Sequence, residues 1–222
     1  MSAERREGVI RFEVRHETRP LEERVHGETA RVLSAWREIL ANLGMLGQDP
    51  ARYEGLGYGN VSARVGPFGD VARGRRRFLV TGTQTAGVAH ATLREFCLVE
   101  SWDVERNSVT SAGLVAPSSE SLTHAALYDA SPATRVVLHA HAPELWRQAR
   151  ALGLPVTHPD AANGTPAMAL EVQRLHREGT LASTRVAAMG GHEDGVIAFG
   201  NTAAEAGTAL VALLARALVL AR

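Results

Sequence analysis

The stretch Ala116–Tyr128, APSSESLTHAALY, is followed closely by Val136–Ala142, VVLHAHA, and these two segments decide which fold and chemistry the sequence predicts. The first carries a carboxylate, Glu120, and the second carries His139 and His141. Side chains at i and i+2 of an extended strand point to the same face, so both imidazoles can converge on one ion. A lone His-Ala-His in an apolar strand is more often structural. Two ionisable groups on one face of a buried strand favour a metal, because unpartnered buried polar groups are costly and imidazole is a common zinc ligand.

Composition and charge limit the classes of protein that fit this chain. Its 222 residues suit one domain over 1–222, with 1–28 as an N-terminal arm or extension. The 24 basic and 24 acidic residues balance, so overall charge favours neither nucleic acid nor an acidic membrane surface as a partner. A single cysteine, Cys97, excludes an intramolecular disulfide. The N-terminal residues lack the apolar segment of a signal peptide, and we expect a cytoplasmic protein.

Two segments look at first like features of other protein classes. The basic cluster Arg73–Arg77 has no aromatic residues interleaved, which favours a solvated hairpin loop over a nucleic-acid site. The apolar run Ala206–Ala221 is interrupted by Arg216 and is shorter than the ~20 residues that span a bilayer. We therefore expect a buried or intersubunit helix there and no membrane partner.

Apolar periodicity and capping signals predict alternating strands and helices along the whole chain. Ser118 or Ser119 is expected to cap the second helix, and Thr202 with Glu205 to form a capping box for the last. The pattern favours an α+β or three-layer α/β/α domain with a mixed, largely antiparallel sheet. Helices are predicted over residues 29–46, 119–129, 143–152, 165–178 and 206–221, and strands over 10–14, 61–65, 78–81, 96–104, 136–140, 185–189 and 196–199.

Three segments offer groups that suit a bound anion. Gly59 permits close approach of the backbone to a ligand and the Asn60 amide can donate to it, although a plain turn explains the pair equally well. The loop Thr81–Gly87 supplies hydroxyls, an amide and backbone N–H groups. Ser118 and Ser119 precede a helix, where free N–H groups and the helix dipole favour negative charge.

Taken in order, these motifs resemble one known family. Gly59-Asn-Val-Ser62, a Thr/Gly-rich loop, Pro-Ser-Ser-Glu, His-x-His and a late histidine near a glycine resemble the class II aldolase/adducin family, from about Leu33 to the C-terminus. The combination of Pro-Ser-Ser-Glu with His-x-His is the specific part of this resemblance. The best-known members are zinc-dependent aldolases of small sugar phosphates. Epimerases, dehydratases and the non-enzymatic adducin head share the fold.

The resemblance implies roles for individual residues. Glu120 falls on the acid/base glutamate of the family, which removes a hydroxyl proton and protonates the enediolate carbon, while zinc or another divalent metal stabilises the enediolate oxygens. A first-turn glutamate that only complements the helix dipole is the alternative. In the sugar-phosphate aldolases the matching segments bind the phosphate. This role is thereby implied for Asn60, Thr81, Gly82, Ser118 and Ser119, with Thr83 or Gly87 as alternative loop contacts.

The third metal ligand departs from the family pattern. Family enzymes commonly carry a histidine directly before the glycine of the penultimate strand, whereas this chain reads GGHEDG over Gly190–Gly195. Aligning the glycines puts Asp194 at that histidine and His192 two residues earlier. In an extended segment both would share a face, so either could reach the ion. We choose His192 because imidazole suits zinc in a histidine-rich site, and we expect Asp194 to orient the site or act as an additional acid.

A second departure concerns the proton donor and leaves the reaction open. Fuculose-phosphate aldolases use a tyrosine of the neighbouring subunit after the His-x-His segment, but this chain has no tyrosine beyond Tyr128. His158 and Asp160 occupy the comparable region by position only, and His124 could line the pocket from the Glu120 helix.

We expect a metal-dependent lyase acting on a phosphorylated sugar or hydroxyketone, assembled as a homo-oligomer, with the ring-shaped tetramer of the family as the expected form. An epimerase or dehydratase using the same ion, and an adducin-like interaction module, are the alternatives. Retention of Glu120 with both histidines argues against the module. Lyase and epimerase or dehydratase share the same apparatus and differ in pocket shape, which the sequence does not separate.

Overall fold

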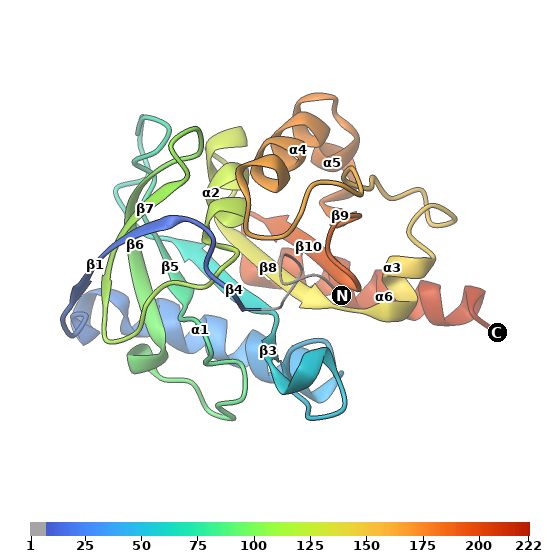
Figure 1. The fold of residues 1–222 in the computed structure, drawn as a ribbon, viewed down its shortest axis with the longest axis horizontal. Helices are drawn as coiled ribbons and strands as arrows, with labels where there is room; N and C mark the ends of the chain where they lie inside the picture. Colours follow the sequence, from blue (N-terminus) through green and yellow to red (C-terminus); the bar gives the residue numbers. More distant parts are fainter. Residues whose placement is uncertain (1–7) are drawn as a thin grey trace.

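A large mixed sheet with helices on both faces forms the core of the computed structural model, which describes residues 8–222 (Figure 1). The strand order is β1-β7-β6-β5-β4-β8-β10-β9. Every neighbouring pair is antiparallel except β1 and β7, which run parallel. The predicted α/β/α architecture with a largely antiparallel sheet is confirmed.

The elements follow the predicted order, with differences at their ends. The strands are β1 Glu13–Thr18, β2 Gly47–Gln48, β3 Gly57–Tyr58, β4 Asn60–Arg64, β5 Phe78–Thr81, β6 Phe96–Asp103, β7 Ser108–Gly113, β8 Val136–His141, β9 Val186–Ala188 and β10 Gly195–Gly200. The helices are α1 Glu23–Asn42, α2 Ser121–Ala130, α3 Pro143–Arg147, α4 Pro166–Arg177, α5 Thr180–Thr184 and α6 Ala203–Leu220. Sequence analysis missed β7, whose small and polar residues lack the usual strand pattern, and it missed the β2–β3 hairpin and α5.

Strand β8 is an interior strand between β4 and β10, in a sheet that separates two hydrophobic cores. Its six residues are all buried, because both faces of the strand are covered. Side chains alternate along a strand, so Leu138 and Ala140 join the core covered by α1 and α6, while Val137 joins the core of α2 and α4. By the same alternation His139 and His141 point to the α2 side.

The start of α2 differs from the prediction that a serine caps it. The helix begins at Ser121 with Glu120 at the N-cap position, and no side chain makes a capping hydrogen bond there. The Ser118 hydroxyl instead accepts from the Glu120 N–H at 3.4 Å, and the Ser121 hydroxyl donates back to the Ser118 carbonyl at 2.7 Å. The helix therefore starts one residue after the carboxylate rather than one residue before it.

The capping box predicted for α6 forms only in part. The Thr202 hydroxyl accepts from the Glu205 N–H at 3.1 Å, as expected. The Glu205 carboxylate, however, accepts from the Asn201 N–H at 3.1 Å and from Arg185 at 2.7 Å, so it does not return to Thr202. The ion pair with Arg185 draws the carboxylate away from the reciprocal position.

Helix α6 is, among the described residues, the one helix long and apolar enough to cross a membrane by length and composition alone. Its buried residues, such as Leu210 and Ala217, belong to the core beside β8 and β10, as is typical of a helix that covers a sheet. Its last turn is exposed at Leu218, Val219 and Leu220.

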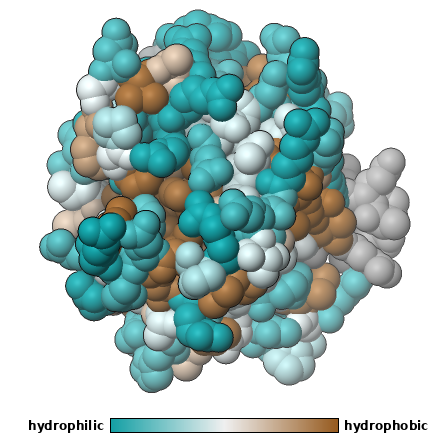
Figure 2. All heavy atoms as spheres, turned by 90° about the vertical axis from the view of Figure 1, so that its left-hand side faces the viewer, coloured by the Kyte–Doolittle hydropathy of each residue, from teal (hydrophilic) through white to brown (hydrophobic). Residues whose placement is uncertain are grey.

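The β1 edge of the sheet carries exposed charged side chains. Glu13, Arg15 and Glu17 of β1 are exposed, and charged side chains on an edge strand oppose pairing with further strands. Figure 2 views the molecule from this side and shows hydrophobic groups set among mostly hydrophilic ones.

Candidate metal and acid/base site

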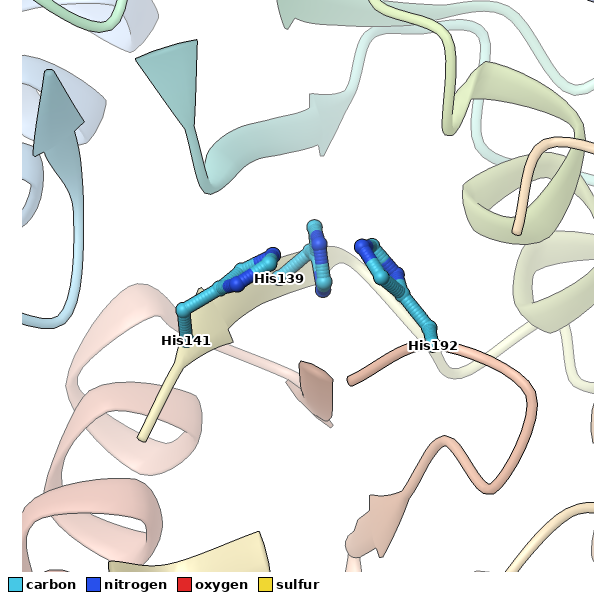
Figure 3. Close-up of side chains that lie close together, drawn as sticks. All are labelled: His139, His141 and His192. Atoms are coloured by element: carbon cyan, nitrogen blue, oxygen red, sulfur yellow. The ribbon is translucent and has the colours of Figure 1, made fainter. Parts of the chain in front are cut away.

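Three buried histidines come together on the α2 side of the sheet. His139 and His141 project from β8, and His192 projects from the turn between β9 and β10 (Figure 3). One ring nitrogen from each lies within 4.8 Å of those from the other two. The three residues are 0%, 1% and 5% exposed. The structure therefore gathers the two histidines of the His-x-His motif with the predicted third residue.

The register of the sheet fixes the two β8 histidines. His139 lies opposite Asn60 of β4 and Ile197 of β10, and His141 lies opposite Gly195. The His139 Nδ1 atom is 3.1 Å from the Val196 carbonyl oxygen, which can only accept, so Nδ1 carries the hydrogen. A neutral ring with its hydrogen at Nδ1 has its lone pair at Nε2, and Nε2 is then the nitrogen that can bind a metal ion.

The segment that carries His192 is a turn rather than an extended strand. The His192 N–H donates to the Met189 carbonyl, and the Gly195 N–H donates back to the His192 carbonyl, both at 3.0 Å. Asp194 has φ of +60° and therefore does not share a strand face with His192. Gly195 gives the imidazole room, since a Cβ atom there would lie 2.9 Å from the His192 Cγ atom.

Asp194 points its carboxylate to a residue that sequence analysis did not single out. The Tyr53 hydroxyl donates to Asp194 Oδ2 at 2.9 Å. The Tyr53 ring also contacts the His141 ring edge to face, with 4.6 Å between the ring centroids. No local sequence signal pairs these residues, because 141 positions separate Tyr53 from Asp194.

Glu120 lies beside the histidines and is fully buried. Its Oε1 atom is 3.9 Å from His192 Nδ1, and its Oε2 atom accepts from the Thr123 hydroxyl at 2.8 Å. Thr123 was not predicted as a site residue, although its i+3 spacing from Glu120 on a helix was the signal for this contact.

Gly164 packs against the segment that carries Glu120, where a Cβ atom on Gly164 would lie 2.9 Å from the Ser119 carbonyl oxygen.

Of the residues predicted to hold an anion, Asn60 begins β4 and Thr81 ends the neighbouring β5, while Ser118 and Ser119 directly precede Glu120 in the chain. The Thr81 hydroxyl accepts from the Val61 N–H at 3.1 Å, which joins β5 to β4 next to Asn60. Gly82 pairs with Pro117, and a Cβ atom on Gly82 would lie 2.3 Å from the Val115 side chain. This glycine thus brings the loop against the segment that leads to Ser118 and Ser119. Asn60, Thr81, Gly82, Ser118 and Ser119 are all buried.

The rest of the Thr/Gly-rich loop is anchored by hydrogen bonds from buried Arg37. The Arg37 guanidinium donates to the carbonyl oxygens of Thr85, Ala86 and Val88. Gly87 lies against Gln48, where a Cβ atom would come within 2.5 Å of the Gln48 side chain. Several hydrogen bonds from one side chain restrict the conformations of the loop.

Other histidines have roles outside this cluster. His124 is buried in the core, where its Nδ1 atom lies 2.7 Å from the Ser62 hydroxyl, and burial lowers the pKa of its ring to about 3. It is therefore neutral at neutral pH. His158 and Asp160 are exposed beside α4, and the His158 backbone N–H donates to Glu171 at 2.8 Å.

Comparisons with known proteins agree with this architecture. The family model described as the Class II Aldolase and Adducin N-terminal domain matches residues 51–219. The L-fuculose-1-phosphate aldolase of Thermus thermophilus is 20% identical over 86% of this chain and 91% of its own, with a TM-score of 0.60. A sugar-phosphate aldolase of Thermotoga maritima is 18% identical over 88% and 94%, with a TM-score of 0.66.

A third similar structure is the N-terminal class II aldolase domain of a conserved protein from Thermoplasma acidophilum, 17% identical over 87% of this chain and 93% of that one, with a TM-score of 0.59. No curated protein sequence matches the chain significantly. At these identities the solved structures establish a shared fold, and the chemistry has to be argued from the residues of this chain.

Proposed function

Because the chain belongs to the class II aldolase and adducin N-terminal domain family, we propose that it is a divalent-metal-dependent lyase. The reaction is the cleavage or formation of a carbon–carbon bond beside a carbonyl, in a small sugar phosphate or hydroxyketone. One observation carries this proposal: a buried cluster of three imidazoles has a carboxylate, Glu120, 3.9 Å from one of its members, His192. Catalytic zinc sites typically have three protein ligands and one open position.

The donor set fits a divalent transition metal, with zinc as our choice. Three neutral imidazoles suit zinc and disfavour the hard ions magnesium and calcium, which prefer oxygen ligands. His139, His141 and His192 would hold the ion, and Asp194 is the weaker candidate because its carboxylate already accepts from Tyr53. When bound, the ion supplies a Lewis acid that stabilises negative charge on a substrate oxygen.

Glu120 is the group that would move the proton. The Thr123 hydroxyl binds Oε2, which fixes the carboxylate plane and leaves Oε1 on the side of His192. Oε1 is therefore the atom to which we assign removal of the substrate hydroxyl proton and its return to carbon. The surrounding burial excludes bulk water, which limits loss of that proton to solvent.

The phosphate or carboxylate of the substrate would bind at the strand ends beside α2. Asn60 and Thr81 would supply an amide and a hydroxyl on one side, and Gly82, whose N–H donates to the Glu95 carbonyl at 2.8 Å, would line the site through its backbone. Ser118 and Ser119 supply hydroxyls on the other side. The start of α2 adds the positive end of the helix dipole, which favours an anion.

The test of this function is exchange of an α-hydrogen with solvent. Incubation of the metal-loaded protein with dihydroxyacetone phosphate or dihydroxyacetone in D₂O should incorporate deuterium, because proton abstraction precedes any need for an aldehyde partner. Nuclear magnetic resonance of the ketone measures the incorporation, and the protein stripped of metal by a chelator is the control.

Two other outcomes would change the assignment. No exchange across a panel of small hydroxyketones and their phosphates, with metal fully bound, would favour an epimerase or dehydratase that uses the same residues. Silence of the wild-type protein across a wider panel of sugar phosphates as well would favour an adducin-like interaction module.

We also propose that the chain forms a symmetric homo-oligomer, with a tetramer as the expected form. Exposed apolar side chains on two helices support this. Val219 at the end of α6 is 72% exposed, and Val25, Val32 and Ile39 of α1 are 56%, 48% and 43% exposed. A spacing of seven residues places those three along one line of α1, and a line of exposed apolar side chains favours an interaction with another chain.

Sedimentation equilibrium at micromolar concentration should therefore give the mass of several chains, with four expected from the ring-shaped tetramer of the family. Placing a charge in this line of α1 with Val32→Glu should lower that mass, because the charge would have to be desolvated on assembly. A monomeric wild-type protein would contradict the proposal and would exclude any catalytic group supplied by a second subunit.

A further inference from the structure

The loop between β2 and β3 contacts the candidate metal site through Tyr53. Tyr53 lies in this loop, and its hydroxyl donates to Asp194 Oδ2 at 2.9 Å. Its ring also packs edge to face on His141, with the ring planes at 72°. One residue therefore contacts the strand that carries two of the proposed ligands and the turn that carries the third.

The direction of the Tyr53 hydroxyl is fixed by Arg52. The Arg52 guanidinium donates to the Tyr53 oxygen at 2.9 Å, and it also donates to the Tyr58 hydroxyl at 3.0 Å and the Gly44 carbonyl at 2.8 Å. A guanidinium has donors only, so the Tyr53 oxygen must be the acceptor in that contact. The single phenol hydrogen is then directed to Asp194.

The turn after His192 is held from two sides. The Ala142 N–H donates to the Asp194 carbonyl at 2.9 Å, which joins the turn to the residue after His141. The Tyr53 hydroxyl holds the Asp194 side chain, which is 8% exposed. Asp194 and Tyr53 have φ of +60° and +51°, a conformation uncommon outside glycine, so their surroundings must hold them there.

We propose that Tyr53 is a positioning residue for the metal centre, acting through Asp194 on His192 and through ring contact on His141. Asp194 is then the anchor of the turn and not a ligand. The inference rests on the proposed metal site and adds to it a residue outside the family motifs of this chain. Loss of a group that orients metal ligands typically weakens metal binding by roughly 10–100-fold.

The experiment is a double-mutant cycle on metal affinity. Zinc is titrated into the apo full-length protein in competition with a chromophoric chelator, for wild type, Tyr53→Phe, Asp194→Ala and the double variant. We expect Tyr53→Phe to weaken zinc binding by roughly 10-fold or more. The double variant should have the same zinc affinity as whichever single variant binds zinc less tightly, because each change breaks the same hydrogen bond. Strain from alanine at residue 194 is common to both Tyr53 backgrounds and cancels in the cycle.

Tyr58→Phe is the matched control. Tyr58 also faces His141, with ring centroids 5.5 Å apart, and its hydroxyl also bonds Arg52, but no hydrogen bond joins it to Asp194. The zinc affinity of Tyr58→Phe should lie within about 3-fold of the wild-type value, a smaller change than the loss expected for a group that orients a ligand. Apo-protein melting temperatures identify any general loss of stability.

Distinct results separate this inference from the proposed function. Wild-type affinity in Tyr53→Phe would overturn the role of Tyr53. A second result would also overturn that role. If the losses of zinc affinity in Tyr53→Phe and Asp194→Ala multiply in the double variant, and Asp194→Ala loses as much affinity as His192→Ala, then Asp194 is a ligand. Absence of zinc binding by the wild-type protein would instead remove the proposed metal centre.

Discussion

Replacing both His139 and His141 with alanine is expected to abolish stoichiometric metal binding. Wild-type protein should carry about one divalent ion per chain, zinc foremost, because three imidazoles close together form a standard catalytic zinc site. The double variant keeps only one of the three ring ligands, and a single neutral imidazole does not retain zinc against a chelator. Elemental analysis by mass spectrometry after gel filtration measures the metal content directly.

The control for this experiment removes two histidines from the surface. His90 and His158 have side chains that are 86% and 62% exposed, so His90→Ala/His158→Ala should keep the metal and the fold. Stoichiometric metal in the His139→Ala/His141→Ala protein would refute these ligands.

Single variants then locate the third ligand. His192→Ala should lose more metal than Asp194→Ala, since the His192 ring lies among the other two and the Asp194 carboxylate is bound to Tyr53. The opposite order would move the ligand to Asp194.

Changing Glu120 to glutamine is expected to lower turnover by roughly 10²–10⁴-fold, the usual range for loss of a general acid–base group. The amide is nearly isosteric, and its oxygen can still accept from the Thr123 hydroxyl, so the side chain should keep its place. Metal content should not change, because the proposed ligands are imidazoles. Deuterium exchange into the substrate ketone measures the proton-transfer step alone.

Thr123→Val provides a graded comparison for Glu120. It removes the hydroxyl that holds Oε2 while leaving the carboxylate able to carry a proton, so turnover should fall less than in Glu120→Gln. Full activity in Glu120→Gln would exclude this residue as the proton carrier. Loss of metal in that variant would instead point to a carboxylate ligand, a role that its 3.9 Å distance from His192 also permits.

Several features of this protein followed from local sequence alone. His139 and His141 share a face because a strand has a two-residue repeat, and that repeat does not depend on the rest of the fold. The helix after Pro117 was predicted to within two residues at each end, although the serine cap expected at its start does not form. Glu120 was placed near the metal by resemblance to a family motif, while the structure supplies its contact with Thr123.

The tertiary structure alone decided how the site is completed. The third histidine was ambiguous in sequence because His192 and Asp194 are equivalent in an extended segment. In the structure the two residues lie in a turn with positive φ at Asp194. The Asp194 carboxylate accepts from Tyr53, while the His192 ring lies with His139 and His141. The contact of Tyr53 with Asp194 spans 141 positions and leaves no periodic or motif signal. Such contacts arise only when loops from distant parts of the chain pack over the same sheet, so local propensity and spacing have no means of predicting them.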